Sequence, residues 1–114
     1  MKVLKFGGAI VGSAEHLKKV KSIVEAEKNP IVVVSAMDGV TDLLEEIVEE
    51  ASTGDSKSII SRYEDLKTRH TELARQVVPA DSQSAALSEL NRLYAEMDSM
   101  LQALTIFRDW TDNI

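Results

Sequence analysis

The chain has 114 residues and no cysteine, so it can form neither a disulfide framework nor a thiolate metal site. Aromatic residues make up only 4%, and no apolar run approaches the length needed to cross a membrane. Residues 1–5 are too short in their apolar part for a signal peptide. No His, Asp or Glu cluster has metal-ligand spacing. These absences predict a cytoplasmic protein that contacts no membrane and holds no metal of its own.

Acidic residues outnumber basic ones, giving a formal net charge of −6, but the excess lies in one part of the chain. Residues 1–40 carry six lysines and four acidic residues, whereas residues 41–114 carry seven basic and fifteen acidic residues. Most of the chain would repel a nucleic acid, so we expect no nucleic-acid partner. A nucleotide phosphate would be attracted to the first third. The alternative is that the acidic helices only keep the protein soluble.

The hydrophobic pattern predicts two strands, residues 2–6 and 31–36, with a helix between them. The apolar run at residues 31–34 is continuous and β-branched, which predicts a strand of a parallel sheet buried on both faces. Ser13 is a candidate N-cap of the helix, and Asn29-Pro30 would end it. The segment is therefore predicted to be a βαβ unit.

After Gly39 the pattern is helical throughout. A first helix ends at residues 52–54, a second begins at Asp55 and ends at Pro79, and a third begins at Asp81. The two long helices carry narrow apolar stripes with spacings of three and four, so we expect an antiparallel hairpin. The stripe of the third helix comprises Ala86, Leu90, Leu93, Met97, Met100, Leu104 and Phe107.

Two strands buried on both faces need more sheet than this chain contains. We therefore predict an α/β fold that forms a single partial domain, residues 1–114. Within it, residues 1–40 form the βαβ unit and residues 41–114 the helical region. The exposed edges of its strands predict a homo-oligomer, formed by strand pairing or by exchange of the helical hairpin.

The segment Lys5-Phe6-Gly7-Gly8 closes the first strand and predicts a phosphate-binding turn. Paired glycines let backbone N–H groups approach an anion, the following helix presents its positive end, and the lysine adds a full charge. The spacing matches neither the P-loop nor G-x-G-x-x-G. Two alternatives stay open, since solubility would explain a lone lysine and a tight turn would explain the glycines.

A second turn follows the second strand. In it Ser35, Gly39 and Thr41 are candidates to hydrogen-bond a substrate carboxylate or phosphate. Thr41 as an ordinary helix N-cap and Asp38 as a turn residue are the alternatives. Two strand-to-helix turns that open the same way are how an α/β sheet builds a nucleotide site. His70 is in line with an apolar stripe, so we expect it to be structural.

These motifs resemble the N-terminus of aspartate kinases, and look closest to the forms fused to homoserine dehydrogenase. The resemblance lies in Lys5-Phe6-Gly7-Gly8, in residues 11–15, and in residues 32–44, which include Ser35-Ala36-Met37-x-Gly39-Val40-Thr41. It covers the whole chain but only about the first quarter of the family's polypeptide. It implies the amino-acid-kinase α/β/α sandwich and transfer of the γ-phosphoryl of Mg-ATP to the β-carboxylate of L-aspartate.

By this resemblance Lys5 would be the catalytic residue that stabilises the transferring phosphoryl. Gly7 and Gly8 would donate backbone hydrogen bonds to the ATP phosphates, and Ser35 and Thr41 would lie at the aspartate side. This agrees with the reading from the residues themselves, because phosphoryl transfer depends mainly on positioning and charge neutralisation.

Two departures argue against activity of this chain alone. The family's Lys-Phe-Gly-Gly is normally followed by Thr-Ser, whereas Ala9-Ile10 carry no hydroxyls. The family's later glutamate, arginine, catalytic aspartate and adenine-binding segment lie beyond residue 114. We therefore expect an inactive N-terminal fragment of an aspartate kinase with no Mg-ATP bound. The alternatives are a non-catalytic interaction or oligomerisation module derived from an amino-acid kinase, and a small phosphate-binding regulatory domain.

Overall fold

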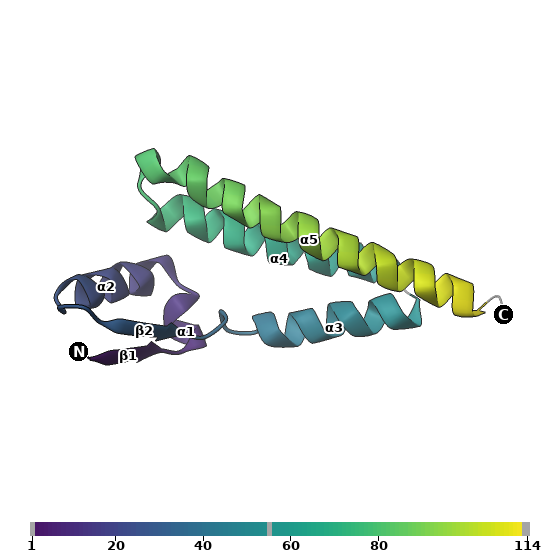
Figure 1. The fold of residues 1–114 in the computed structure, drawn as a ribbon, viewed down its shortest axis with the longest axis horizontal. Coiled ribbons are helices and arrows are strands. Elements are labelled where there is room, and N and C mark those ends of the chain that lie inside the picture. Colours follow the sequence, from purple (N-terminus) through teal and green to yellow (C-terminus); the bar gives the residue numbers. More distant parts are fainter. Residues whose placement is uncertain (1, 55, 113–114) are drawn as a thin grey trace. The chain divides into compact units, whose positions relative to one another are not determined.

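The computed structural model describes residues 2–54 and 56–112 (Figure 1). In chain order the elements are β1 (Val3–Phe6), α1 (Gly8–Val11), α2 (Ala14–Glu25), β2 (Ile31–Val34), α3 (Val40–Thr53), α4 (Ser56–Val77) and α5 (Ala80–Asp112). The chain forms two compact units, residues 1–41 (unit 1) and residues 42–114 (unit 2). The prediction of a two-stranded parallel βαβ unit followed by three helices is confirmed.

In unit 1 the strands β1 and β2 pair in parallel, with Val3 opposite Ile31 and Phe6 opposite Val34. The prediction that Ser13 caps the next helix is confirmed, since its side chain accepts a hydrogen bond from the N–H of His16. The segment between the strands also contains α1, a single helical turn that the pattern did not predict. Because the two strands are parallel, both end at the same edge of the sheet, and each is followed by a turn.

The prediction that β2 is buried on both faces is wrong for the described residues. All four of its side chains are exposed: Ile31 by 44%, Val32 by 41%, Val33 by 43% and Val34 by 59%. A strand is buried on both faces only in a sheet with layers above and below it. The described sheet has two strands, so each of them is an edge strand. The β-branched composition predicts that this segment is a strand, but it does not show whether other layers bury that strand.

Several element ends differ from the sequence prediction. β2 ends at Val34, before residues 35 and 36, and α2 ends at Glu25, before Asn29-Pro30. Asn29 has a φ of 52°, a left-handed conformation that asparagine tolerates better than most residues. The predicted cap Asp55 lies outside the described residues. The stop at Pro79 is confirmed, because α4 ends at Val77 and α5 begins at Ala80.

In unit 2 the helices α4 and α5 form the predicted antiparallel hairpin (Figure 1). Its centre is a pair of buried tyrosines whose rings meet edge to face, 6.4 Å between centroids. The Tyr63 hydroxyl donates to the carbonyl oxygen of Tyr94 at 2.7 Å, and the Tyr94 hydroxyl donates to that of Lys67 at 3.3 Å. Lys67 also places its ammonium 5.3 Å from the Tyr63 ring centroid. These contacts fix the register of the two helices.

Two arginines join α3 to the hairpin. Arg62 on α4 pairs with Glu46 and Glu50 on α3. Arg108 on α5 donates to the carbonyl oxygen of Ala51 at 3.3 Å, near the end of α3, where a cation stabilises the helix dipole. Beneath these contacts Ile47 and Ala51 are fully buried. Unit 2 is therefore a three-helix assembly with its own core.

The apolar stripe predicted for α5 is only partly buried. Tyr94 and Leu101 are buried, but neither belongs to the predicted stripe. Four members of the predicted stripe are exposed: Leu93 by 45%, Met100 by 66%, Leu104 by 36% and Phe107 by 65%. The helix is turned so that Tyr94 reaches α4 with its ring and its hydroxyl. The spacing of apolar residues does not distinguish this orientation of the helix from one rotated about its axis by about 100°, the angle between successive residues.

Candidate functional site

The two turns of unit 1 meet where β1 and β2 end. The N–H of Ser35 donates to the carbonyl oxygen of Phe6 at 3.0 Å and continues the strand pairing by one step. Beyond it, the N–H of Asp38 donates to the carbonyl oxygen of Gly8 at 3.1 Å. The glycine turn and the serine turn are thus joined directly by backbone hydrogen bonds.

Gly8 is the residue that permits this close approach. A Cβ at Gly8 would lie 2.8 Å from the carbonyl oxygen of Ala36 and 3.1 Å from the nitrogen of Asp38. Both of those atoms belong to backbone, so neither moves easily. A Cβ at Gly7, by contrast, would meet nothing within 4 Å. Gly8 therefore packs the two turns together, whereas Gly7 leaves open space on its side.

The helical turn α1 begins directly at this junction. The carbonyl oxygen of Gly7 accepts hydrogen bonds from the N–H groups of Ile10 and Val11, both at 3.1 Å. The N–H groups of Gly8 and Ala9 belong to the first turn, where a helix provides no partner of its own. The side chains of Ala9 and Ile10 are exposed and add no hydrogen-bonding group. The hydrogen-bonding groups that this turn itself offers are therefore its backbone N–H groups.

Lys5 is an exposed cation two residues before Gly7. It lies on β1 opposite Val33 and forms no ion pair with any residue that the structure describes. Lys2, near the other end of the strand, is instead bound to Glu27 at 3.1 Å. Among the described residues, Lys5 therefore has no acidic partner, whereas Lys2 has one in Glu27.

The second turn requires Gly39. It has a φ of 81° and lies in a turn closed by the N–H of Val40 on the carbonyl oxygen of Met37, 3.0 Å. Asp38 lies in this turn, in agreement with the alternative that it is a turn residue. Thr41 is exposed in the first turn of α3, which begins at Val40, so its alternative role as the N-cap is wrong.

The structure brings some of the predicted site residues together and not others. Gly8 and Ser35 are joined to the opposite turn by hydrogen bonds, and Gly7 and Lys5 adjoin the same edge. Within the part of the chain that the structure describes, the Thr41 side chain forms no hydrogen bond to this junction. The sequence did not predict the hydrogen bond from Asp38 to Gly8, although the paired glycines indicated that another backbone segment approaches them closely.

Other candidate chemistry is absent from the described part of the chain. It contains no group of three His, Cys, Asp or Glu residues that could hold a metal ion. His70 is partly buried, with Nδ1 2.9 Å from the carbonyl oxygen of Leu66, so the prediction of a structural histidine agrees with its contacts. None of the described helices is both long enough and apolar enough to cross a membrane.

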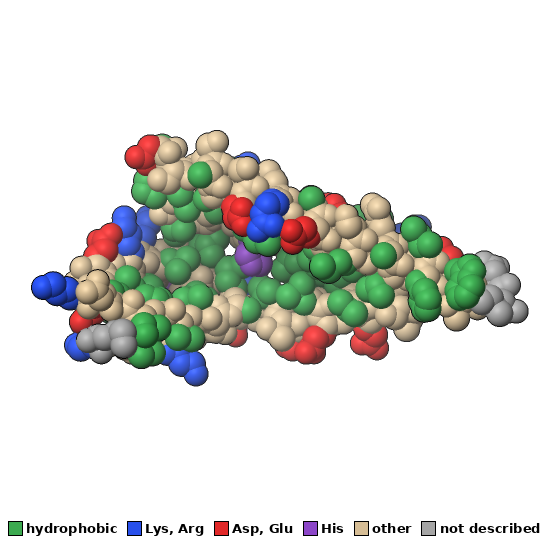
Figure 2. Space-filling view, viewed as in Figure 1, with side chains coloured by type: hydrophobic (Ala, Val, Ile, Leu, Met, Phe, Trp, Pro, Cys, Tyr) green, Lys and Arg blue, Asp and Glu red, His purple; other side chains and the backbone are tan. Residues whose placement is uncertain are grey.

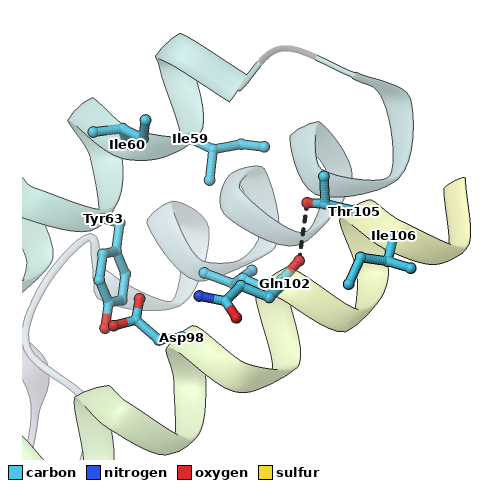
Figure 3. Close-up of a pocket in the computed structure, with 8 residues that line it drawn as sticks. Ile59, Ile60, Tyr63, Asp98, Gln102, Thr105 and Ile106 are labelled. Carbon is cyan, nitrogen blue, oxygen red and sulfur yellow. Dashed lines mark hydrogen bonds between the residues drawn. The ribbon is translucent and has the colours of Figure 1, made fainter. Parts of the chain in front are cut away.

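A cavity of about 400 Å³ lies in unit 2 between α4 and α5 (Figure 3). Its walls are mainly aliphatic, with Ile59, Ile60 and Ile106 around Tyr63 and with Asp98 as its charged group. Burial, with a contribution from Asp98, raises the pKa of Tyr63 to about 12. An aliphatic cavity with a carboxylate repels a phosphate, so this is not a nucleotide site. No predicted site residue lines it.

Comparison with known proteins identifies the class of protein to which these turns belong. The sequence model of the amino acid kinase family matches residues 1–106. The chain belongs to the amino acid kinase family. The resemblance to aspartate kinases, drawn from the two turns, is thereby confirmed at the level of the family.

The curated relatives of this amino acid kinase chain are aspartokinases, several of them bifunctional. It is 31% identical over 106 residues to bifunctional aspartokinase/homoserine dehydrogenase 2, chloroplastic, of Arabidopsis thaliana, which covers 91% of this chain and 12% of that protein. It is 37% identical over 75 residues to the aspartokinase of Chlamydia muridarum, covering 66% of this chain and 16% of that protein. The chain thus spans between about a tenth and a sixth of the length of these relatives.

Proposed function

We propose that this chain is the N-terminal part of an aspartate kinase, whose longer form transfers the γ-phosphoryl of ATP to the β-carboxylate of L-aspartate. The observation that carries the proposal is the junction of the two turns, where the N–H of Asp38 donates to Gly8, together with Lys5, which pairs with no acidic residue among those the structure describes. Membership of the amino acid kinase family and the printed names of the relatives support it.

In this proposal the first turn binds phosphate. Lys5 neutralises charge on the transferring phosphoryl, and the N–H groups of Gly7 and Gly8 donate to phosphate oxygens. The open space at Gly7 fits a phosphate group, and so does the lack of an acidic partner for Lys5 within residues 2–54 and 56–112. Mg-ATP would supply the phosphoryl group. The chain's own contribution in this proposal is to hold phosphate oxygens.

The second turn is the proposed substrate side. Ser35, Gly39 and Thr41 would position the aspartate carboxylate, with Ser35 and Thr41 as exposed hydroxyl donors and Gly39 as the residue that shapes the turn. In phosphoryl transfer the acceptor oxygen must lie in line with the leaving oxygen. The hydrogen bond from Asp38 to Gly8 would fix the two turns, and with them the two reactants, at a set spacing.

We further propose that residues 1–114 are a partial domain, that the protein acts in the cytoplasm, and that the chain alone is inactive. The direct assay is incubation with Mg-ATP and L-aspartate, followed by detection of aspartyl phosphate. We expect no product above background. Clear turnover would contradict the proposal that the site is incomplete.

Activity is tested by grafting residues 1–106 into the Arabidopsis relative, in place of its matching segment. We expect the graft to form aspartyl phosphate above the background of a relative from which that segment is deleted. A graft that folds and binds ATP but forms no aspartyl phosphate would contradict the assignment of these turns to aspartate phosphorylation.

A second candidate function is a non-catalytic interaction or oligomerisation module. The apolar side chains at Ala9-Ile10 favour it, and so do the exposed apolar side chains of β2 and α5. A homo-oligomer would form by strand pairing or by exchange of the hairpin. Isothermal titration with aspartate and with ATP distinguishes the two candidates, since binding at millimolar concentration or better argues against the module.

A further inference from the structure

The cavity between α4 and α5 is a part of unit 2 that the proposed phosphoryl transfer does not use. Its volume of about 400 Å³ falls within the range of roughly 300–1,000 Å³ that small-molecule sites occupy. Its floor is apolar, since Ile59, Tyr63 and Leu101 are all buried. Ile60 and Ile106 form apolar walls that are 63% and 68% exposed. The cavity therefore offers a preformed site to an apolar group.

The wall that α5 contributes is a single face of that helix. It consists of Asp98, Leu101, Gln102, Thr105 and Ile106. Spacings of three and four residues place side chains on the same side of a helix, so the polar groups of this face lie in line with its apolar ones. At the start of the face, the Asp98 carboxylate points toward the Tyr63 hydroxyl (Figure 3).

The polar groups around the cavity mainly accept hydrogen bonds. The Tyr63 hydroxyl donates its proton to the carbonyl oxygen of Tyr94 at 2.7 Å, and the Thr105 hydroxyl donates its proton to that of Leu101 at 2.9 Å. Each hydroxyl oxygen therefore has only lone pairs to offer a ligand, and an ionised carboxylate such as that of Asp98 can only accept. These three groups suit a ligand that donates hydrogen bonds.

The charge around the cavity is negative. Asp98 forms no ion pair with any residue that the structure describes. Unit 2 carries seven basic and fifteen acidic residues. On the face shown in Figure 2, acidic side chains lie over both α3 and the hairpin. Fixed charge of one sign raises the local concentration of ligands of the opposite sign. A cation is therefore favoured at this cavity and an anion disfavoured.

We propose that this cavity binds a primary alkylammonium ion, with the ammonium at Asp98 and the alkyl chain against the isoleucines. An ammonium has three donors and no acceptor, which matches the acceptors of Asp98, Tyr63 and Thr105. The alkyl chain matches the apolar floor and walls. The site includes none of the residues assigned to phosphoryl transfer, so the proposal does not depend on that function.

Isothermal titration of the chain with pentylammonium, pentanol and pentanoate tests the proposal. The three probes share an alkyl chain and differ in the charge of the head group. We expect saturable binding of pentylammonium at millimolar concentration or better. Pentanol should bind about tenfold more weakly, because a charge-assisted hydrogen bond is stronger than a neutral one, and pentanoate should not bind. Equal affinity for pentylammonium and pentanol, or no saturable binding of pentylammonium, would overturn the proposal.

Asp98→Asn removes the charge and keeps the shape of the side chain. We expect it to weaken the binding of pentylammonium by about tenfold and to leave that of pentanol unchanged. Asp65→Asn is the matched control, because Asp65 is an exposed carboxylate on α4 that does not line the cavity. Both positions are exposed, so circular dichroism should show unchanged helix in both variants. Equal losses of affinity would show a general effect of charge and would contradict the role of Asp98.

The isoleucine methyl resonances in an NMR spectrum locate the bound probe. Pentylammonium should shift the methyl resonances of Ile59, Ile60 and Ile106, which line the cavity. Ile23 is the control, because it is 49% exposed but belongs to unit 1. Its resonances should not move. Shifts of equal size at Ile23 and at the three cavity residues would indicate nonspecific contact with exposed apolar groups and would contradict the proposed site.

Discussion

The backbone N–H of Asp38 donates a hydrogen bond to the carbonyl oxygen of Gly8 at 3.1 Å. This single contact joins the turn after β1 to the turn after β2, which are thirty residues apart in the chain. It converts two local sequence motifs into one surface at the end of the sheet. Because the two motifs carry the proposed phosphate and substrate groups, the integrity of this contact is central to the proposed function.

Gly8→Ala should disrupt the junction, since the added Cβ would lie 2.8 Å from the carbonyl oxygen of Ala36. We expect it to lower the free energy of unfolding by about 1–3 kcal/mol, the usual cost of overpacking. Gly7→Ala is the matched control, because Gly7 has φ −80° and open space around its Cβ position. Urea denaturation measures both variants, and equal losses would contradict the separate roles of the two glycines.

Gly39 is required by its φ of 81°, which alanine adopts only with strain. We expect Gly39→Ala to cost about 1–2 kcal/mol of stability and Gly39→Asn distinctly less, because asparagine tolerates this conformation. Thermal unfolding of the two variants tests this order. If Gly39→Ala were as stable as Gly39→Asn, the turn would not depend on the left-handed conformation.

The tyrosine pair of the hairpin predicts an alkaline loss of stability. The pKa of Tyr63 is raised to about 12 in the folded protein, mainly by burial, against about 10 in an unfolded chain. The folded state therefore holds the hydroxyl proton more tightly. The resulting stability is fully present below about pH 10 and is lost as the pH rises towards 12.

Denaturation at a series of pH values tests this linkage. We expect the free energy of unfolding to fall between pH 10 and 12, and to fall less steeply in Tyr63→Phe. Some dependence should remain, because burial also raises the pKa of Tyr94. Identical slopes in the native chain and in Tyr63→Phe would show that Tyr63 does not titrate as described.

Much of the fold could be predicted because it is encoded locally. The parallel pairing of β1 and β2 follows from a β-branched run, and the hairpin follows from spacings of three and four that end at Pro79. Ser13 caps α2 because a serine before a helical pattern has one obvious partner, the N–H of His16. Local patterns of this kind need no knowledge of distant contacts.

The remainder depends on contacts between distant residues. Which side of α5 faces α4 is decided by Tyr94, whose hydroxyl reaches Lys67 on the other helix. The burial expected for Val32 and Val33 depends on layers that the described residues do not supply. At the site, the paired glycines indicated a close approach but not that Gly8 packs against Ala36 while Gly7 stays open. Sequence spacing does not identify the partner in such contacts.

The central claim is that Lys5, in this junction, neutralises a phosphoryl group during transfer to aspartate. The most direct measurement is the rate of aspartyl phosphate formation by the graft of residues 1–106 in the Arabidopsis relative, with Lys5→Met compared to Lys2→Met. Lys2 is the control because Glu27 already pairs with it. We predict a loss of about 10²–10³ for Lys5→Met and little change for Lys2→Met. A Lys5→Met graft as active as its parent would contradict the account.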